Sequence, residues 1–147
     1  MKNIDLEFFE YISGRLAEAQ NVKYEWRNDN TEIVLKKKND EGFDIIIGHH
    51  KDYLYLDTDR GYHGHFEAFE NFSEMLIHVM GLARDLLSKN MRIKEISTNS
   101  KPRKWVLEHC KNGVWKKEAL SGLLVWNYFG KTNVRYYSND ILPVREL

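Results

Sequence analysis

The chain has 147 residues, of which 42% are hydrophobic and 30% charged, and its formal net charge is zero. This size and composition are typical of one globular domain and exclude a disordered chain. The longest apolar run, residues 123–126, is too short to cross a bilayer. The single cysteine, Cys110, excludes an internal disulfide, and the start of the chain has no apolar run of signal-peptide type. We therefore expect a cytoplasmic protein.

The first half of the chain predicts a helix followed by a meander of strands. Leu6, Phe9, Ile12 and Leu16 recur at helical spacing, which indicates a helix from residue 5 to residue 20. From residue 22 to residue 67 the apolar period becomes two, with polar turns at residues 28–30, 38–42, 51–52 and 59–61. This pattern predicts four or five antiparallel strands, with the isoleucine-rich segment 43–48 at the centre.

The second half repeats this order. A wide apolar arc predicts a deeply buried helix that begins at Asn71 or Ser73 and ends at residues 88–90. Alternating patterns at 91–96 and 105–110 predict strands, and Asn112-Gly113 predicts a tight hairpin turn. Residues 123–129 are compatible with a strand or a short helix, and residues 134–137 with a last strand.

The order of elements is thus helix, β-meander, helix, β-meander. Two helices packed on an antiparallel sheet are the simplest arrangement that buries both apolar stripes. We therefore expect a single α+β domain over residues 1–147.

Charge is unevenly distributed along the chain despite the neutral total. The segment 52–74 is acidic, with Arg60 as its only cation apart from histidine, and the segment 89–117 is basic, with only Glu95 and Glu108 as acids. If the fold keeps these segments apart, an acidic surface and a basic surface result. If it does not, they are ordinary solvated charges.

The acidic segment also holds the candidates for chemistry. His63 and His65 share a face if they lie in a strand, and the turn at residues 59–61 could bring them to Asp57 and Asp59. Imidazole and carboxylate groups bind zinc or iron and transfer protons near neutral pH. A metal-dependent or acid–base enzyme is therefore one alternative. The sequence contains no recognised metal motif, nucleophile elbow or phosphate-binding loop, so we expect no catalytic residue, metal or cofactor.

A second alternative is a nucleic-acid or small-ligand binder that uses the basic hairpin at residues 101–117. Trp105, Trp115, Trp126 and Tyr128 accompany the basic residues, and such interleaving can bind single strands. The neutral total charge and the lack of an RNA-binding motif argue against it. Tyrosine and tryptophan are also common anchors of protein interfaces.

Three segments carry a family resemblance. The run at residues 124–131, the run at residues 136–143 and the central run at residues 52–61 resemble parts of short bacterial proteins. Some of those are similar to the immunity partners of polymorphic or contact-dependent toxins. The resemblance covers about half of the chain, and it implies a protein that binds a toxin and needs no catalytic residue.

We therefore expect a protein-binding module, most simply an immunity protein that neutralises a cognate toxin such as a cationic nuclease. Its docking surface would combine carboxylates, histidines and aromatic anchors from the middle of the chain. The expected partner-binding residues are Tyr55, Asp57, Asp59, Tyr62, His63, His65, Phe66, Glu67 and Glu70. We expect no membrane partner, and the sequence leaves the oligomeric state open.

Overall fold

The computed structural model describes residues 3–67, 71–122 and 131–143. Two helices and nine strands lie within these ranges. In chain order they are α1 (Ile4–Glu18), β1 (Tyr24–Arg27), β2 (Glu32–Leu35), β3 (Ile45–His50), β4 (Tyr53–Thr58), β5 (His63–Phe66), α2 (Phe72–Leu86), β6 (Met91–Thr98), β7 (Lys101–Lys111), β8 (Val114–Gly122) and β9 (Thr132–Tyr137). The expectation for residues 123–129 lies outside the described residues.

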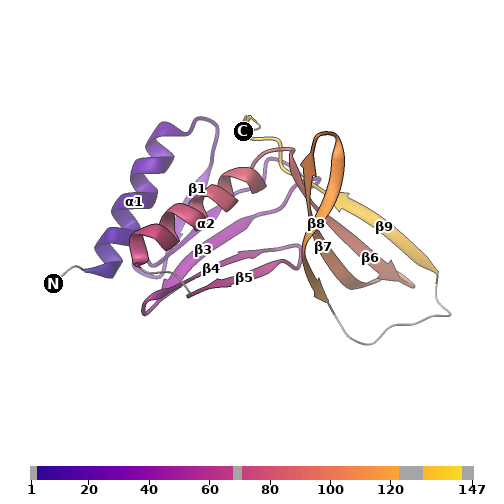
Figure 1. Ribbon diagram of the computed structural model, residues 1–147, viewed down its shortest axis with the longest axis horizontal. Coiled ribbons are helices and arrows are strands. Elements are labelled where there is room, and N and C mark those ends of the chain that lie inside the picture. Colours follow the sequence, from indigo (N-terminus) through magenta and orange to yellow (C-terminus); the bar gives the residue numbers. More distant parts are fainter. Residues whose placement is uncertain (1–2, 68–70, 123–130, 144–147) are drawn as a thin grey trace.

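The strands form two antiparallel sheets (Figure 1). The first has five strands in the order β1-β2-β3-β4-β5, and the second has four in the order β8-β7-β6-β9. The predicted α+β class and the order helix, β-meander, helix, β-meander are confirmed. The structure adds that the two meanders make separate sheets, each with its own edges.

Helix α1 begins directly after Asn3, which caps it. The side chain of Asn3 accepts hydrogen bonds from the backbone amides of Asp5 and Leu6. Its buried stripe has a spacing of four and consists of Phe8, Ile12 and Leu16. The expected stripe was wrong at its start, because Leu6 lies on another face of the helix and is 52% exposed.

Helix α2 lies beside α1 on the same face of the first sheet (Figure 1). Asn71 caps its start, and its predicted apolar arc is buried along the whole helix. Both helices pack on the inward side chains of β2, β3 and β4. The largest of these inward side chains are Ile33, Leu35, Ile45, Ile47, Leu54 and Leu56, each no more than 1% exposed.

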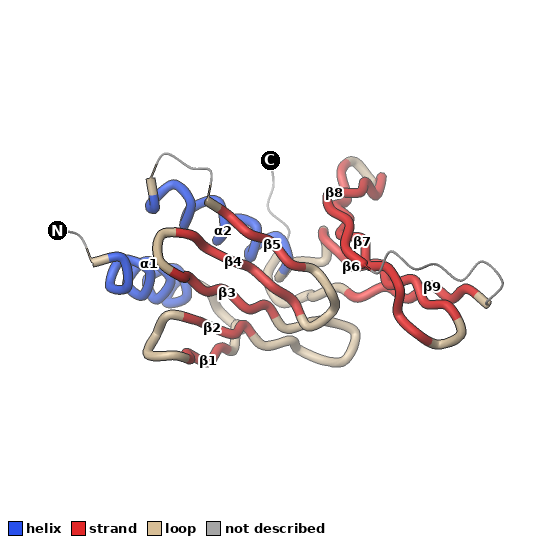
Figure 2. Tube along the Cα trace, turned by 90° about the horizontal axis from the view of Figure 1, so that it is seen from below, coloured by secondary structure: helices blue, strands red, loops and turns tan. Residues whose placement is uncertain are grey.

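The opposite face of the first sheet is not covered by the helices. Figure 2 looks onto this face, with α2 behind the strands. Because successive side chains of a strand alternate, the residues between the core positions point to this side. We call it the open sheet face and define it by Glu32, His50, Tyr53, Tyr55, Asp57, His63 and His65.

The second sheet joins the same core through one of its faces. Ile93 and Leu107 contribute to the hydrophobic cluster that includes the first sheet and both helices. The β4–β5 turn packs against this sheet, with Gly61 close to the Trp105 ring and the Arg60 guanidinium 4.2 Å from the centre of the Tyr137 ring. The Asp57–His63 end of the open sheet face therefore lies beside the second sheet.

Candidate functional site

The β4–β5 hairpin places four of the expected site residues on the open sheet face. Tyr55 and Asp57 lie on β4, directly opposite His65 and His63 on β5. The intervening residues Leu54 and Leu56 are fully buried on the other face. The period of two that predicts the strand is therefore the cause of this grouping.

Asp57 and His63 form an ion pair across the hairpin when the imidazole is protonated. The His63 Nδ1 atom contacts Asp57 Oδ1, while the histidine side chain remains 64% exposed. A carboxylate on Nδ1 orients the ring and leaves Nε2 directed away from Asp57. The pair thus presents a ring nitrogen on the surface.

His65 is held by a different carboxylate and by an aromatic ring. Its Nε2 lies 3.3 Å from Glu67 Oε2, and its ring centre lies 4.3 Å from that of Tyr53. Tyr53 also contacts His50, at 5.6 Å between ring centres. Three rings from three strands therefore lie together on the open sheet face.

The Tyr55 side chain lies along the surface of the sheet and extends across β3. Its hydroxyl donates a hydrogen bond of 2.5 Å to Glu32 Oε2 on β2, two strands away. Burial raises the pKa of the Tyr55 phenol, and the hydrogen bond and charge of Glu32 raise it further. Tyr55 is therefore a neutral, fixed surface group at physiological pH.

Two expected aromatic anchors lie elsewhere. Phe66 points to the helix side of the sheet, where its ring centre is 5.6 Å from that of His78 on α2. Tyr62 is half-buried against the hydrophobic core, and burial raises its pKa, with a smaller effect from Asp57. Neither residue belongs to the open sheet face.

The remaining acidic residues are spread out. Asp59 Oδ1 accepts a hydrogen bond of 2.9 Å from the backbone amide of Asp44, so this side chain joins the β4–β5 turn to the segment before β3. Glu67 follows β5 and is exposed. Glu70 lies outside the described residues. The face is consequently less acidic than the sequence suggests, with histidines beside its carboxylates.

The expected cluster of His63, His65, Asp57 and Asp59 does not converge. Asp57 contacts His63, whereas His65 contacts Glu67 and Asp59 contacts Asp44. In the described part of the chain, no group of three or more His, Cys, Asp or Glu residues is placed to hold a metal ion. The arrangement offers hydrogen bonds and charges to a docked surface.

Sequence reasoning missed Glu32, His50 and Tyr53. The alternation along β3 could have found His50, because His49 has the opposite direction and is buried beside Phe8, with 4.7 Å between ring centres. Glu32 carried no local signal. The only sign of this contact in the sequence is indirect: a glycine inside a strand, here Gly48, often marks the close approach of another group.

The aromatic residues of the basic segment have partners within the chain. The Arg92 guanidinium lies 3.9 Å from the centre of the Trp115 ring and 4.1 Å from that of Tyr136. The Trp105 indole donates a hydrogen bond of 3.1 Å to Glu95 Oε2. Trp126 and Tyr128 lie outside the described residues. The described rings stabilise the second sheet instead of forming a free platform for bases.

No family model matches the chain, and neither the curated proteins nor the solved structures contain a match. Among the residues described, no helix is long and apolar enough to span a membrane. Any assignment of function therefore rests on the geometry of the site.

Proposed function

We propose that the chain is a protein-binding module of the immunity type, which docks on a partner toxin through the open sheet face. The observation that carries this proposal is the grouping of Tyr53, Tyr55, Asp57, His63 and His65 on one uncovered side of the first sheet. Tyrosine rings with fixed neighbours are favoured interface anchors because they lose little conformational entropy on binding.

The charges of this face fit a basic partner. Asp57 and Glu67 carry negative charge at neutral pH, and Glu32 supports Tyr55 from β2. Carboxylates around aromatic anchors attract a cationic surface and accelerate its association. The active site of a nuclease toxin is such a surface, because it binds a polyanion.

The Asp57–His63 pair alone favours a second candidate, an acid–base enzyme. A histidine oriented by a carboxylate is a common general base. The pair lies on an exposed face, where water surrounds the imidazole, whereas such catalysis gains most in sites that exclude water. Docking therefore accounts better for the whole group of residues.

The test is co-expression of the chain with the protein encoded by the adjacent gene, followed by calorimetry on the purified pair. We expect a complex whose affinity falls by about 100-fold in the Tyr53→Ala/His65→Ala variant, since central anchors each contribute about 1–2 kcal/mol. The matched control is Lys111→Ala/Lys116→Ala, which removes two exposed side chains from the β7–β8 hairpin.

We expect the control variant to bind as tightly as the unchanged chain. Circular dichroism spectra of both variants, compared with that of the unchanged chain, test whether the variants are folded. Equal affinity of the face variant and the control would show that the partner binds elsewhere, and the absence of any complex would overturn the proposal.

A further inference from the structure

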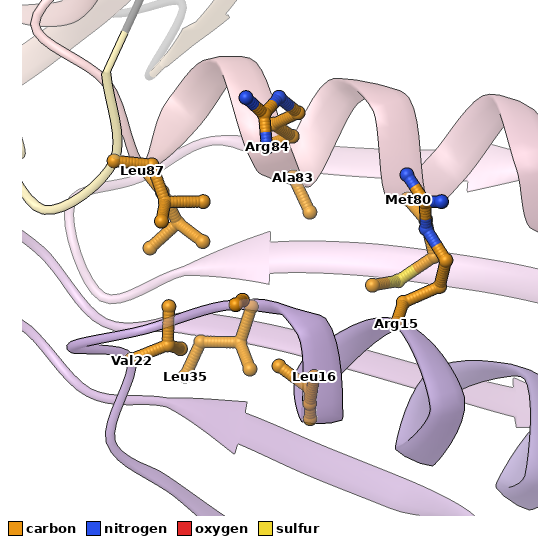
Figure 3. Close-up of a pocket in the computed structure, with 10 residues that line it drawn as sticks. Arg15, Leu16, Val22, Leu35, Met80, Ala83, Arg84 and Leu87 are labelled. Atoms are coloured by element: carbon orange, nitrogen blue, oxygen red, sulfur yellow. The ribbon is translucent and has the colours of Figure 1, made fainter.

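The helix side of the first sheet is closely packed and leaves a ligand little room. Figure 3 shows Leu16, Val22 and Leu35 facing Ala83 and Leu87 near the C-terminal ends of α1 and α2. The free space among them is about 40 Å³, which is enough for a few water molecules. Backbone groups that another chain can bind lie instead at the edges of the two sheets.

Four strands form the sheet edges in the described part of the chain: β1, β5, β8 and β9 (Figure 1). Short strands, charged side chains and irregular pairing protect an edge from other chains. β1 and β5 have four residues each, and β8 has consecutive charges at residues 116–118 and a register shift in its pairing with β7. β9 has six residues in unbroken register with β6 and a single charge, Arg135, so it is the least protected edge.

The hydrogen bonds between β6 and β9 show which residues of β9 face the free edge. The Asn99 amide donates to the Lys131 carbonyl oxygen at 3.0 Å, and these two residues continue the register of the strand pair. Bonded pairs alternate along an antiparallel ladder, so Lys131 and every second residue after it bond to β6. Thr132, Val134 and Tyr136 therefore direct their N–H and C=O groups away from β6, and no strand in the described ranges pairs with them on that side.

The same positions of β9 expose apolar side chains. Val134 and Tyr136 are both 47% exposed, whereas Tyr137, on the other face of the strand, is buried in the core. The Arg92 guanidinium lies over the Tyr136 ring, 4.1 Å from its centre, and holds this ring in place. Unpaired backbone groups beside exposed apolar side chains are what the addition of another strand requires.

A second copy of β9 fits this edge in an antiparallel register. When Val134 lies opposite Val134 of the second copy, Thr132 lies opposite Tyr136, and the free backbone groups of both strands meet at each of these pairs. Opposed residues of this kind exchange two hydrogen bonds. The pairing has a two-fold axis at the Val134 pair, as a symmetric dimer requires. The two Val134 side chains then cover each other on one face of the joined sheet.

The charges of β9 disfavour the neighbouring registers. With Val134 opposite itself, Arg135 lies opposite Asn133 of the second copy. Sliding one strand by two residues brings Arg135 opposite either the second Arg135 or Lys131, and like charges directly opposite each other are destabilising. Sliding by one residue sets the free backbone groups against groups that already bond to β6. A single register therefore satisfies both the hydrogen bonds and the charges.

We propose that two copies of the chain form a symmetric dimer through β9, which joins their four-stranded sheets into one continuous sheet. The interface goes beyond the proposed docking function and uses none of the residues of the open sheet face. One strand from each copy makes a small contact, so we expect a dissociation constant on the order of 10–100 μM.

The first experiment is sedimentation equilibrium of the full chain at concentrations from about 1 μM to about 1 mM, a range that spans this dissociation constant. The mass should rise from 17.5 kDa towards twice that value. Val134→Lys places two like charges together at the two-fold axis and should weaken the dimer about tenfold or more. The matched control is Val114→Lys, which changes a valine of similar exposure, 56%, at the start of β8 and should leave the dissociation constant unchanged. A chain that stays monomeric at the highest concentration, or equal dissociation constants for the two lysine variants, would overturn the proposal.

A further variant tests the register by a gain of affinity. Asn133→Glu places a carboxylate opposite Arg135 of the second copy, twice in the symmetric dimer, and should tighten the dimer about fivefold. Amide exchange measured by nuclear magnetic resonance locates the contact. The amides of Val134 and Tyr136 should exchange rapidly in the monomer and slowly in the dimer, whereas that of Arg135 is protected in both. Association of Asn133→Glu that is unchanged or weaker, or exchange at Val134 that is independent of concentration, would contradict pairing through β9.

Discussion

The Tyr55 phenol lies across Gly48 and donates its hydrogen bond to Glu32, so that one side chain links β4 to β2 over the strand between them. Only glycine leaves room for this path, because a Cβ at position 48 would lie 2.1 Å from the Tyr55 oxygen. The Tyr55 side chain therefore has a fixed position on the open sheet face. Fixed side chains reduce the entropy lost on association.

A double-mutant cycle tests this relationship. Gly48→Ala should displace Tyr55 from Glu32 and lower the free energy of unfolding by about 1.5–3 kcal/mol, the value of a hydrogen bond to a charged group. In a Tyr55→Ala background the same change should cost at least about 1 kcal/mol less. Urea unfolding gives the free energy of unfolding of the unchanged chain, the two single variants and the double variant. Additive effects would show that the ring does not lie over Gly48.

Gly14→Ala is the matched control for that cycle. Gly14 lies inside α1, and a Cβ there meets no atom within 4 Å. Because alanine is the better helix former, this change should raise the free energy of unfolding by up to about 1 kcal/mol. A loss of stability instead would show that the surroundings of Gly14 are more crowded than this structure has them.

The raised pKa of Tyr55 predicts a distinct behaviour at alkaline pH. A phenol in the unfolded chain ionises near its ordinary pKa of 10.0, whereas Tyr55 in the folded chain stays protonated above that value. Its contribution to stability is therefore complete below pH 10 and is lost as the pH rises towards the folded pKa. Absorbance at the tyrosinate band should show Tyr55 among the late-titrating tyrosines, together with Tyr62, whose pKa burial also raises.

Glu32→Gln should lower the pKa of Tyr55, because it removes the nearby negative charge. The shift should be partial, since burial is the largest cause of the raised pKa and remains in the variant. Tyr55→Phe should remove one tyrosine from the late transition and leave Tyr62, whose pKa is also raised. An unchanged amplitude of the late transition in Tyr55→Phe would show that Tyr55 does not contribute to it.

Asn139 is predicted to matter for stability far more than its place near the end of the chain suggests. It is 1% exposed, accepts a hydrogen bond from the Phe43 amide, and donates to the carbonyl oxygens of Phe43 and Leu86. Asn139→Ala leaves these buried backbone groups without partners, so it should cost about 3 kcal/mol. Asn133→Ala, at an exposed position on β9, should change the free energy of unfolding by less than about 0.5 kcal/mol.

Gly61, in the β4–β5 turn beside the second sheet, and Gly113, in the β7–β8 turn, distinguish crowding from backbone strain. Gly61 and Gly113 have φ angles of 91° and 78°, so alanine is strained at both. A Cβ at Gly113 meets nothing within 4 Å, whereas one at Gly61 would lie 2.4 Å from the Trp105 ring. We expect Gly113→Ala to cost about 1 kcal/mol and Gly61→Ala clearly more. Thermal unfolding and tryptophan fluorescence measure the difference, and equal costs would contradict the packing of Trp105 on the turn.

Local patterns in the sequence were sufficient for the elements themselves. Asn71, one of the two starts that the sequence offers for the second helix, caps α2, and Asn112 and Gly113 take the positive φ angles of 53° and 78° that the hairpin requires. Alternation also placed His63 and His65 on one face. Each of these features depends only on residues that are close together in the sequence. The sequence is therefore sufficient to predict them.

The arrangement of the elements depends on distant pairs that no local pattern contains. The strand order of the second sheet depends on β9 returning to pair with β6, for example Val134 opposite Ile96. Tyr62 was expected at the docking surface as an aromatic anchor in the acidic segment, but its ring packs against the hydrophobic core. Asp59 binds the Asp44 amide only because the turn meets the segment before β3.

The most direct test of the docking face is chemical modification of the histidines with diethyl pyrocarbonate, read by mass spectrometry with and without the bound partner. His50, His63 and His65 are exposed on the open sheet face, and His78 is exposed on α2. The account predicts that the partner slows modification of the first three at least tenfold and leaves His78 unchanged. Protection of His78 alone, or modification of His63 and His65 at the same rate in both samples, would contradict it.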